Sequence, residues 1–189
     1  MYAIASLLDP LSDQTVRSLW AFFERSCGLT GVRTTPLPHF SWQGADAYVI
    51  DPVEDTLAHI AEQCAPFVVR TAGLGIFTGK MPVVYIPLVK DEHLLNMHKM
   101  VWEAVRPYAI VPNVYYDPAH WVPHITLALR EVDPSRLGCA VEEIASKPIE
   151  LEIMVDNLSL IFQSNGQAGI KNRFTFKENI TLRGIQGFL

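Results

Sequence analysis

Two stretches of the chain share one pattern and decide the fold: Leu37-Pro38-His39-Phe40-Ser41-Trp42 and Val122-Pro123-His124-Ile125-Thr126-Leu127. Each places a histidine directly after a proline and a hydroxyl residue two positions later. Each is also followed, within about a dozen residues, by an aspartate that starts a helix. An internal duplication of a strand and helix unit is the economical explanation of such a repeat.

The prolines predict that both stretches are β-strands. Proline lacks an amide donor and holds the residue before it in extended geometry, so it belongs at the first position of a strand. Alternate side chains of a strand share a face, so His39 and Ser41 point one way while Phe40 points the other. The same alternation puts His124 and Thr126 on one face. If the duplicated strands lie side by side, these four polar side chains line one groove.

A groove of this composition suits chemistry at phosphorus. Displacement there needs a proton removed on one side and delivered on the other, and two imidazoles that titrate near neutrality can do both. His39 and His124 are therefore the candidate acid-base pair. Ser41 and Thr126 are candidate donors to the non-bridging phosphoryl oxygens. One His-x-Ser alone would more often be a hydrogen-bonded core histidine, so the hypothesis depends on two in matched contexts.

With these motifs the sequence resembles the two-histidine (2H) phosphoesterase superfamily, which includes bacterial 2'-5' RNA ligase-like proteins and RNA 2',3'-cyclic phosphodiesterases. The segments 74–77 and 82–88 look like the part of the family between its motifs, and His39 and His124 stand 85 positions apart, similar to the usual separation. The resemblance covers nearly the whole chain. It implies a bilobal α+β fold in which His124 activates water and His39 protonates the leaving alkoxide.

The chain departs from the family pattern at two places. The first motif reads His-Phe-Ser-Trp, where His-x-Thr followed by an aliphatic residue is commoner. Many relatives have an arginine five residues after the second histidine, whereas Arg130 follows His124 by six. Strand alternation would put Arg130 on the catalytic face, where it is a candidate phosphate ligand.

Further candidates for substrate binding lie outside the motifs. Trp121 and Tyr115, with Tyr116, could stack on a base as aromatics of RNA-binding proteins do, or could simply pack a loop. Lys80 is a candidate member of an anion-binding patch, although dispersed basic side chains are usually solvated surface. Lys171 and Arg173 are candidates for the same patch. The three histidines that we expect at the surface or rim, with no metal role, are His59, His93 and His98.

Helix and strand signals alternate along the chain and predict an α+β fold. Helix starts are expected at Ser12, Asp51, Asp91 and Asp133, and Gly28 is a candidate left-handed C-cap. Ser164-Asn165-Gly166 is a hairpin turn signal. No linker separates domains, so we expect a single bilobal unit over 1–189, with its two lobes carrying the motifs at 39–42 and 124–127. The strands expected besides the motifs are 2–8, 67–71, 74–78, 83–89, 149–155, 158–163 and 173–177.

Composition limits the partners. Fifteen Lys and Arg against 20 Asp and Glu give a net charge of -5, which disfavours long duplex nucleic acid. Cys27, Cys64 and Cys139 are odd in number and widely spaced, and are expected to be small buried hydrophobes in a reducing compartment. The N-terminus has no signal-peptide pattern and no apolar run is long enough to span a membrane. We therefore expect a cytoplasmic monomer with no membrane partner.

The function that these observations predict is metal-independent hydrolysis of a 2',3'-cyclic or related phosphodiester on a small nucleotide or an RNA end. No cofactor is expected. Two alternatives stay open: a nucleotide sensor that binds without turnover, and a protein of RNA 2'-5' end joining or repair. The absence of a nucleotidyl-transfer lysine motif disfavours an ATP-dependent ligase.

Overall fold

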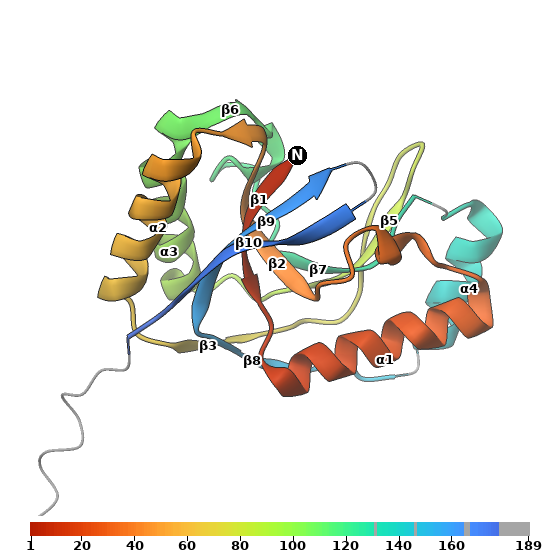
Figure 1. Ribbon diagram of the computed structural model, residues 1–189. Coiled ribbons are helices and arrows are strands. Elements are labelled where there is room, and N and C mark those ends of the chain that lie inside the picture. Colours follow the sequence, from red (N-terminus) through yellow and green to blue (C-terminus); the bar gives the residue numbers. More distant parts are fainter. Residues whose placement is uncertain (131, 146, 165–166, 178–189) are drawn as a thin grey trace, which may run out of the picture.

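The computed structural model describes residues 1–130, 132–145, 147–164 and 167–177, and it confirms the α+β class (Figure 1). Within these ranges an eight-stranded sheet has the order β10-β9-β1-β2-β7-β5-β4, with β6 paired to β2. Its strands are β1 (Tyr2–Leu7), β2 (His39–Tyr48), β4 (Gly75–Phe77), β5 (Val83–Pro87), β6 (Ala109–Pro112), β7 (His124–Ala128), β9 (Asn157–Ser164) and β10 (Gln167–Thr175). The pairings are antiparallel, and a separate antiparallel pair joins β3 (Phe67–Arg70) to β8 (Glu152–Val155).

Four α-helices in the described residues form two packed pairs. Helix α1 packs against α4, and α2 packs against α3. Figure 1 shows the two pairs at opposite ends of the sheet. The helices are α1 (Pro10–Cys27), α2 (Ile50–Gln63), α3 (Glu92–Val105) and α4 (Pro134–Ala145), and the short 3-10 turns are η1 (Gly31–Thr34), η2 (Arg106–Tyr108) and η3 (Val114–Tyr116). The predicted unit of 1–189 and its division into lobes stay predictions.

The helix ends confirm some of the capping predictions and correct others. Asp91 caps α3, and Gly28 ends α1 in the left-handed region at φ 66°. The cap of α1 is Asp9 rather than Ser12, because its carboxylate accepts from the amides of Leu11 and Ser12. Likewise α2 begins one residue before Asp51. The predicted turn at 165–166 lies outside the described residues.

The cysteine prediction was wrong for two of the three residues. Cys27 at the end of α1 and Cys139 on α4 form a disulfide across 112 positions of sequence. Cys64 is the free cysteine of the described chain. Spacing along the chain could not show this pairing, because it is the packing of α1 on α4 that brings the two thiols together. A reducing compartment was expected because the cysteines were expected to be unpaired. Because two of them form a disulfide, the cysteines no longer support that expectation.

A buried polar network explains the tryptophan of the first motif. The Trp42 indole is fully buried and donates to the Ser6 hydroxyl at 2.8 Å. Ser6 in turn donates to the Asn157 carbonyl at 2.6 Å, and the Asn157 amide donates to the Leu7 carbonyl at 2.9 Å. Buried polar groups are stable only when paired in this way. The network joins β1, β2 and β9 behind the first motif, where an aliphatic residue could not take part.

Candidate active site

The two motif strands are neighbours at the centre of the sheet. Phe40 of β2 faces Ile125 of β7 in an antiparallel pair. This register sets His39 across from Thr126 and Ser41 across from His124, with all four side chains on the face opposite to the buried Phe40 and Ile125. The structure therefore brings the four residues that the sequence singled out onto adjoining strands and one face.

The two imidazoles are held by the same hydrogen bond. His39 Nδ1 lies 2.5 Å from the carbonyl oxygen of Leu37, and His124 Nδ1 lies 2.7 Å from that of Val122. In each case the acceptor is the residue before the motif proline. Because a carbonyl oxygen only accepts, Nδ1 carries the proton, and Nε2 of the neutral ring is left as the basic nitrogen. Both rings can thus exchange a proton through Nε2.

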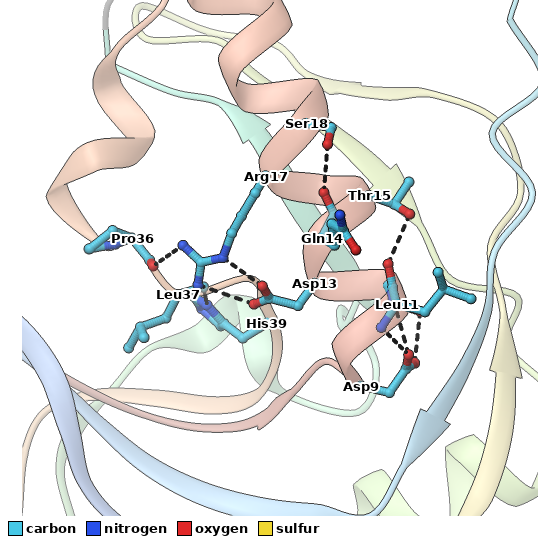
Figure 2. A network of polar contacts seen from close by, with 11 residues as sticks. Asp9, Leu11, Asp13, Gln14, Thr15, Arg17, Ser18, Pro36, Leu37 and His39 are labelled. Carbon is cyan, nitrogen blue, oxygen red and sulfur yellow. Dashed lines mark hydrogen bonds and ion pairs between the residues drawn. The ribbon is translucent and has the colours of Figure 1, made fainter.

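The loop that supplies the Leu37 carbonyl is held to α1 by a hydrogen bond (Figure 2). Arg17 forms an ion pair with Asp13 one turn earlier on the helix and donates to the Pro36 carbonyl at 3.1 Å. The next residue is Leu37, whose carbonyl accepts from His39. The orientation of the first imidazole therefore depends on a chain of contacts that starts on the helix.

A register shift occurs at the fourth residue of each motif. Ile4 and Ala5 of β1 face Gln43 and Ser41, so Trp42 is passed over. Val84 and Tyr85 of β5 face Ala128 and Thr126, so Leu127 is passed over. Such bulges bend a strand and re-aim its side chains. Simple alternation therefore holds from the histidine to the hydroxyl residue and fails beyond it.

The backbone carbonyl of each hydroxyl residue accepts a hydrogen bond from a tryptophan indole outside the motif. Trp121 Nε1 donates to the Ser41 carbonyl at 3.0 Å, and Trp20 Nε1 donates to the Thr126 carbonyl at 2.9 Å. Both carbonyls lie beside the register shifts, next to the single residue pair that joins β2 to β7. The indoles satisfy acceptors that a continuous ladder would otherwise engage. The two motifs are thus alike in backbone support as well as in sequence.

Both imidazoles are easier to deprotonate than a free histidine. Burial lowers the pKa of His39; the hydrogen bond to Leu37 opposes this, and the charge on nearby His124 lowers the pKa further. Burial also lowers the pKa of His124, against the hydrogen bond to Val122. Desolvation disfavours the charged ring, and a bound anion would have the opposite effect. Two neutral rings are therefore favoured in the protein alone, and a phosphate would favour protonation of one.

The two histidines open into adjoining cavities. His39, Ser41 and Thr126 line a cavity of about 280 Å³, whereas His124 lines its neighbour of about 560 Å³. Asn113 and Tyr116 line both.

Tyr116 occupies this boundary because of a glycine. A Cβ at Gly44 would lie 3.0 Å from the Tyr116 ring, so a larger residue there would require the ring to move away by a few tenths of an ångström. Burial raises the pKa of the Tyr116 phenol, and a side-chain hydrogen bond with Ser41 opposes this rise.

The proposed substrate-binding residues have different surroundings. Arg130 lines the His39 cavity. Strand alternation does not explain this position, because β7 ends at Ala128 and Arg130 has a φ of 68°. Tyr115 is 75% exposed and lines the His124 cavity. Lys80 lines neither cavity; it lies in a shallow depression beyond Arg130. Their roles stay predictions.

Trp121 lines the His124 cavity, but packing covers most of its side chain. The side chain is only 3% exposed, and its ring stacks on His98 at 3.7 Å and on Trp42 at 5.6 Å between centroids. A ring covered in this way offers no face to a base, so Trp121 supports β2 through its indole N–H instead. Its place directly before the second motif suggested a groove residue, and only packing could show that it turns into the core.

His98 was expected at the surface and is instead 1% exposed. Its Nε2 lies 3.1 Å from the carbonyl oxygens of both Trp42 and Tyr116, so it donates between them and joins η3 to β2. Burial lowers its pKa to about 4. His59 and His93 are exposed, as expected.

The sequence analysis also missed the role of Trp20. Its position on the inner face of α1 follows from the periodicity of that helix, but its hydrogen bond to the Thr126 carbonyl could not be predicted.

No group of three or more His, Cys, Asp or Glu side chains that could hold a metal ion occurs in the part of the chain that the structure describes. Over the same residues, no helix is long and apolar enough to cross a membrane.

The fold and site together define a class of protein: an α+β protein in which two His-x-Ser/Thr strands share one face. The chain belongs to the 2'-5' RNA ligase superfamily, whose family model matches residues 9–167. The fold is similar to that of the protein TT0787 of Thermus thermophilus, known from a crystal structure, with a TM-score of 0.63 and 19% identity over 94% of this chain and 98% of that chain. No curated protein matches the sequence. Membership of this superfamily indicates an enzyme of the phosphoesterase or ligase type that acts on phosphodiesters.

Proposed function

We propose that the protein hydrolyses a 2',3'-cyclic or related phosphodiester of a small nucleotide or RNA end, without a metal ion or cofactor. The observation that carries the proposal is the matched pair of imidazoles, each with Nδ1 bound to a carbonyl and Nε2 available for proton transfer. A hydroxyl residue lies across the strand pair from each ring. The pair supplies a base and an acid for one phosphorus atom.

In the proposed reaction, His124 Nε2 takes a proton from water as the water oxygen attacks phosphorus. The bond from phosphorus to one ribose oxygen breaks, and protonated His39 gives its Nε2 proton to that oxygen. Ser41 and Thr126 donate hydrogen bonds to the non-bridging oxygens, whose charge is greatest in the transition state. The product is a ribose phosphate monoester, and exchange with solvent restores both rings.

The substrate itself helps to set the protonation state that this reaction needs. Burial lowers the pKa of both histidines in the protein alone. A bound phosphodiester anion stabilises the positive ring, so substrate binding favours protonation of His39. His124 stays neutral because two adjacent positive charges would repel each other. Binding thereby prepares one acid and one base.

Turnover of a panel of 2',3'-cyclic mononucleotides in the presence of EDTA, followed by mass spectrometry, tests the proposal. A gain of one water by the ligand at an undiminished rate in EDTA is the expected result. Saturable binding of an unchanged ligand would show the sensor alternative instead. In a parallel assay with RNA fragments, joining of their ends through a 2'-5' linkage, without hydrolysis, would show the end-joining alternative. We further propose a cytoplasmic monomer, which sedimentation and cell fractionation can test.

A further inference from the structure

The two hydroxyl residues of the candidate site differ in how freely their hydroxyl groups rotate. Thr126 is β-branched, and its methyl group restricts rotation about χ1. Ser41 lacks this methyl group, so its hydroxyl can occupy three staggered positions. A hydroxyl carries one proton, and Ser41 donates to a phosphoryl oxygen only when this proton points at the phosphate. The first motif therefore depends on another group to orient the Ser41 hydroxyl.

The register shift in β2 brings Tyr116 beside Ser41. On the neighbouring strand β1, Ala5 is the partner of Ser41. After the shift, Ala3 is the partner of Gly44. Residues two apart on a strand share a face, and so do cross-strand partners, so Ser41 and Gly44 are on the same face of the sheet. The Tyr116 ring lies over Gly44, where an added Cβ would be 3.0 Å from it, and it lines the same cavity as Ser41.

One buried pair of rings holds the backbones of Ser41 and Tyr116. The rings of His98 and Trp121 stack face to face, with 3.7 Å between centroids and 3° between planes. Trp121 Nε1 donates to the Ser41 carbonyl at 3.0 Å. His98 Nε2 donates to the Tyr116 carbonyl at 3.1 Å. Because both donors belong to one packed unit, Ser41 and Tyr116 keep a fixed position relative to each other.

The turn η3, which carries Tyr116, is also held to β2 directly. The Asn113 amide donates to the Gly44 carbonyl at 2.8 Å, and the Asn113 carbonyl accepts from the Tyr116 amide at 3.1 Å. The Asn113 side chain caps the turn by accepting from the Tyr115 amide at 3.0 Å. These bonds fix the backbone from which the Tyr116 ring extends over Gly44.

The Tyr116 phenol has a side-chain hydrogen bond with the Ser41 hydroxyl. Burial raises the pKa of this phenol, so it keeps its proton near neutral pH. A phenol that donates to Ser41 Oγ leaves the serine proton free for the substrate, whereas the reverse arrangement would consume that proton. The Thr126 hydroxyl has no hydrogen bond within the part of the chain that the structure describes. The phenol therefore accompanies the hydroxyl residue that lacks the restricting methyl group.

We propose that Tyr116 is a positioning residue whose phenol donates to Ser41 Oγ and so directs the Ser41 proton to a non-bridging phosphoryl oxygen. The proposal rests on the proposed function for the role of Ser41. Tyr116 exchanges no proton with the substrate, and it acts through the serine hydroxyl alone. The first motif thereby obtains from a distant turn the restriction that the second motif has in its threonine.

A double-mutant cycle on kcat tests this role. Ser41→Ala should lower kcat by about 10², because a donor to the transition state is lost. Tyr116→Phe should lower kcat by about tenfold with KM nearly unchanged, since the misdirected proton matters most in the transition state. Tyr116→Phe added to Ser41→Ala should cost nothing further, because the phenol acts through Ser41. Tyr108→Phe, in η2, removes a phenol that lines neither cavity and should change nothing.

Some kinetic outcomes would contradict the role of Tyr116 and leave the hydrolysis standing. Losses that multiply in the double variant would show that Tyr116 acts independently of Ser41 and would overturn the proposal. So would a wild-type kcat in Tyr116→Phe, or a fall of kcat that accompanies a lower melting temperature and persists in the Ser41→Ala background.

Calorimetric titration with inorganic phosphate repeats the cycle without turnover. Either substitution should weaken phosphate binding by about fivefold, the worth of one hydrogen bond, and both together should weaken it no further. This result in a protein that hydrolyses no cyclic nucleotide would refute the hydrolytic function and keep the positioning role. Multiplying losses of phosphate affinity would overturn the positioning role. A wild-type protein that neither binds phosphate nor shows turnover would refute both.

Discussion

The surroundings of the first and second motifs differ far more than the motifs themselves. Both have a ring held by the carbonyl two residues earlier, a register shift at the fourth residue and an indole on the hydroxyl residue's carbonyl. His39, however, lines the smaller cavity, and the buried Trp42 network lies behind its strand. His124 packs against aromatic rings, with Phe77 at 4.9 Å and Tyr85 at 5.1 Å between centroids.

This difference indicates how a duplicated unit can give two unlike roles. The backbone geometry that fixes each Nδ1 is local, so both halves keep it. The cavities at the two rings are lined by different elements: the 3-10 turn η1 and β9 line the His39 cavity, β4 lines the His124 cavity, and η3 lines both. If the two rings have the proposed roles of acid and base, the packing around the strands is where they differ. Each prediction below compares the surroundings of the first motif with those of the second.

The largest effect is expected from removing either ring. His39→Ala and His124→Ala should each lower kcat by about 10² to 10⁴, because each removes one proton transfer, and both variants should melt near the wild-type temperature. The double variant should be little worse than either single one, since the two rings act as a unit. His59→Ala, on the exposed side of α2, is the control. Full activity in either single variant would end the mechanism.

A smaller effect, on stability rather than catalysis, is expected from the disulfide that joins α1 to α4, beside the second motif strand β7. Replacing both Cys27 and Cys139 by serine should lower the free energy of unfolding by about 2 to 4 kcal/mol, because the disulfide restrains the unfolded chain. Denaturant titration measures this change. Hydrogen exchange should quicken in α1, α4 and β7 more than in β1 and β2. Cys64→Ser is the matched control, and an equal loss in that variant would contradict the role of the disulfide.

The indoles allow the supports of the two motifs to be compared. Trp121→Phe removes the donor to a buried carbonyl and should cost about 1 to 3 kcal/mol of stability. Trp20→Phe should cost less, because its bond to Thr126 is only partly buried and water can replace it. Chemical unfolding gives both values, and kcat should fall more in Trp121→Phe than in Trp20→Phe. Equal losses in the two variants would show that the supports are equivalent.

The smallest expected effect is a shift in titration. Burial and the charge on His124 both lower the pKa of His39, so His124→Ala should raise the midpoint of the His39 ring in an NMR titration. In the wild-type protein both midpoints should lie below 6.5, the ordinary pKa of a histidine. The kcat/KM profile should then be bell-shaped, falling at high pH as the acid loses its proton and at low pH as the base gains one. A His39 midpoint that is unchanged in His124→Ala would show that the rings do not interact.

Local pattern determined much of this protein. The Pro-His-x-Ser/Thr repeat predicted two strands with the imidazole and hydroxyl on one face, because alternation along a strand has a period of two and needs no distant contact. The same reasoning gave α3 its cap at Asp91 and α1 its end at Gly28. For Arg130 it gave the right side of the sheet for the wrong reason: Arg130 lines the His39 cavity, but the register shift at Leu127 and its own left-handed backbone interrupt the period.

Tertiary structure decided what surrounds those two strands. The Trp121 bond to Ser41 spans 80 positions, the Trp20 bond to Thr126 spans 106, and the disulfide spans 112. Burial of His98 and Trp121, and the division of the groove into two cavities, follow from the same long-range packing. Such contacts leave no period in the sequence, because they depend on which faces of separate elements meet. The sequence alone therefore determined which motif side chains share one face of the sheet, and only packing decided what each histidine faces.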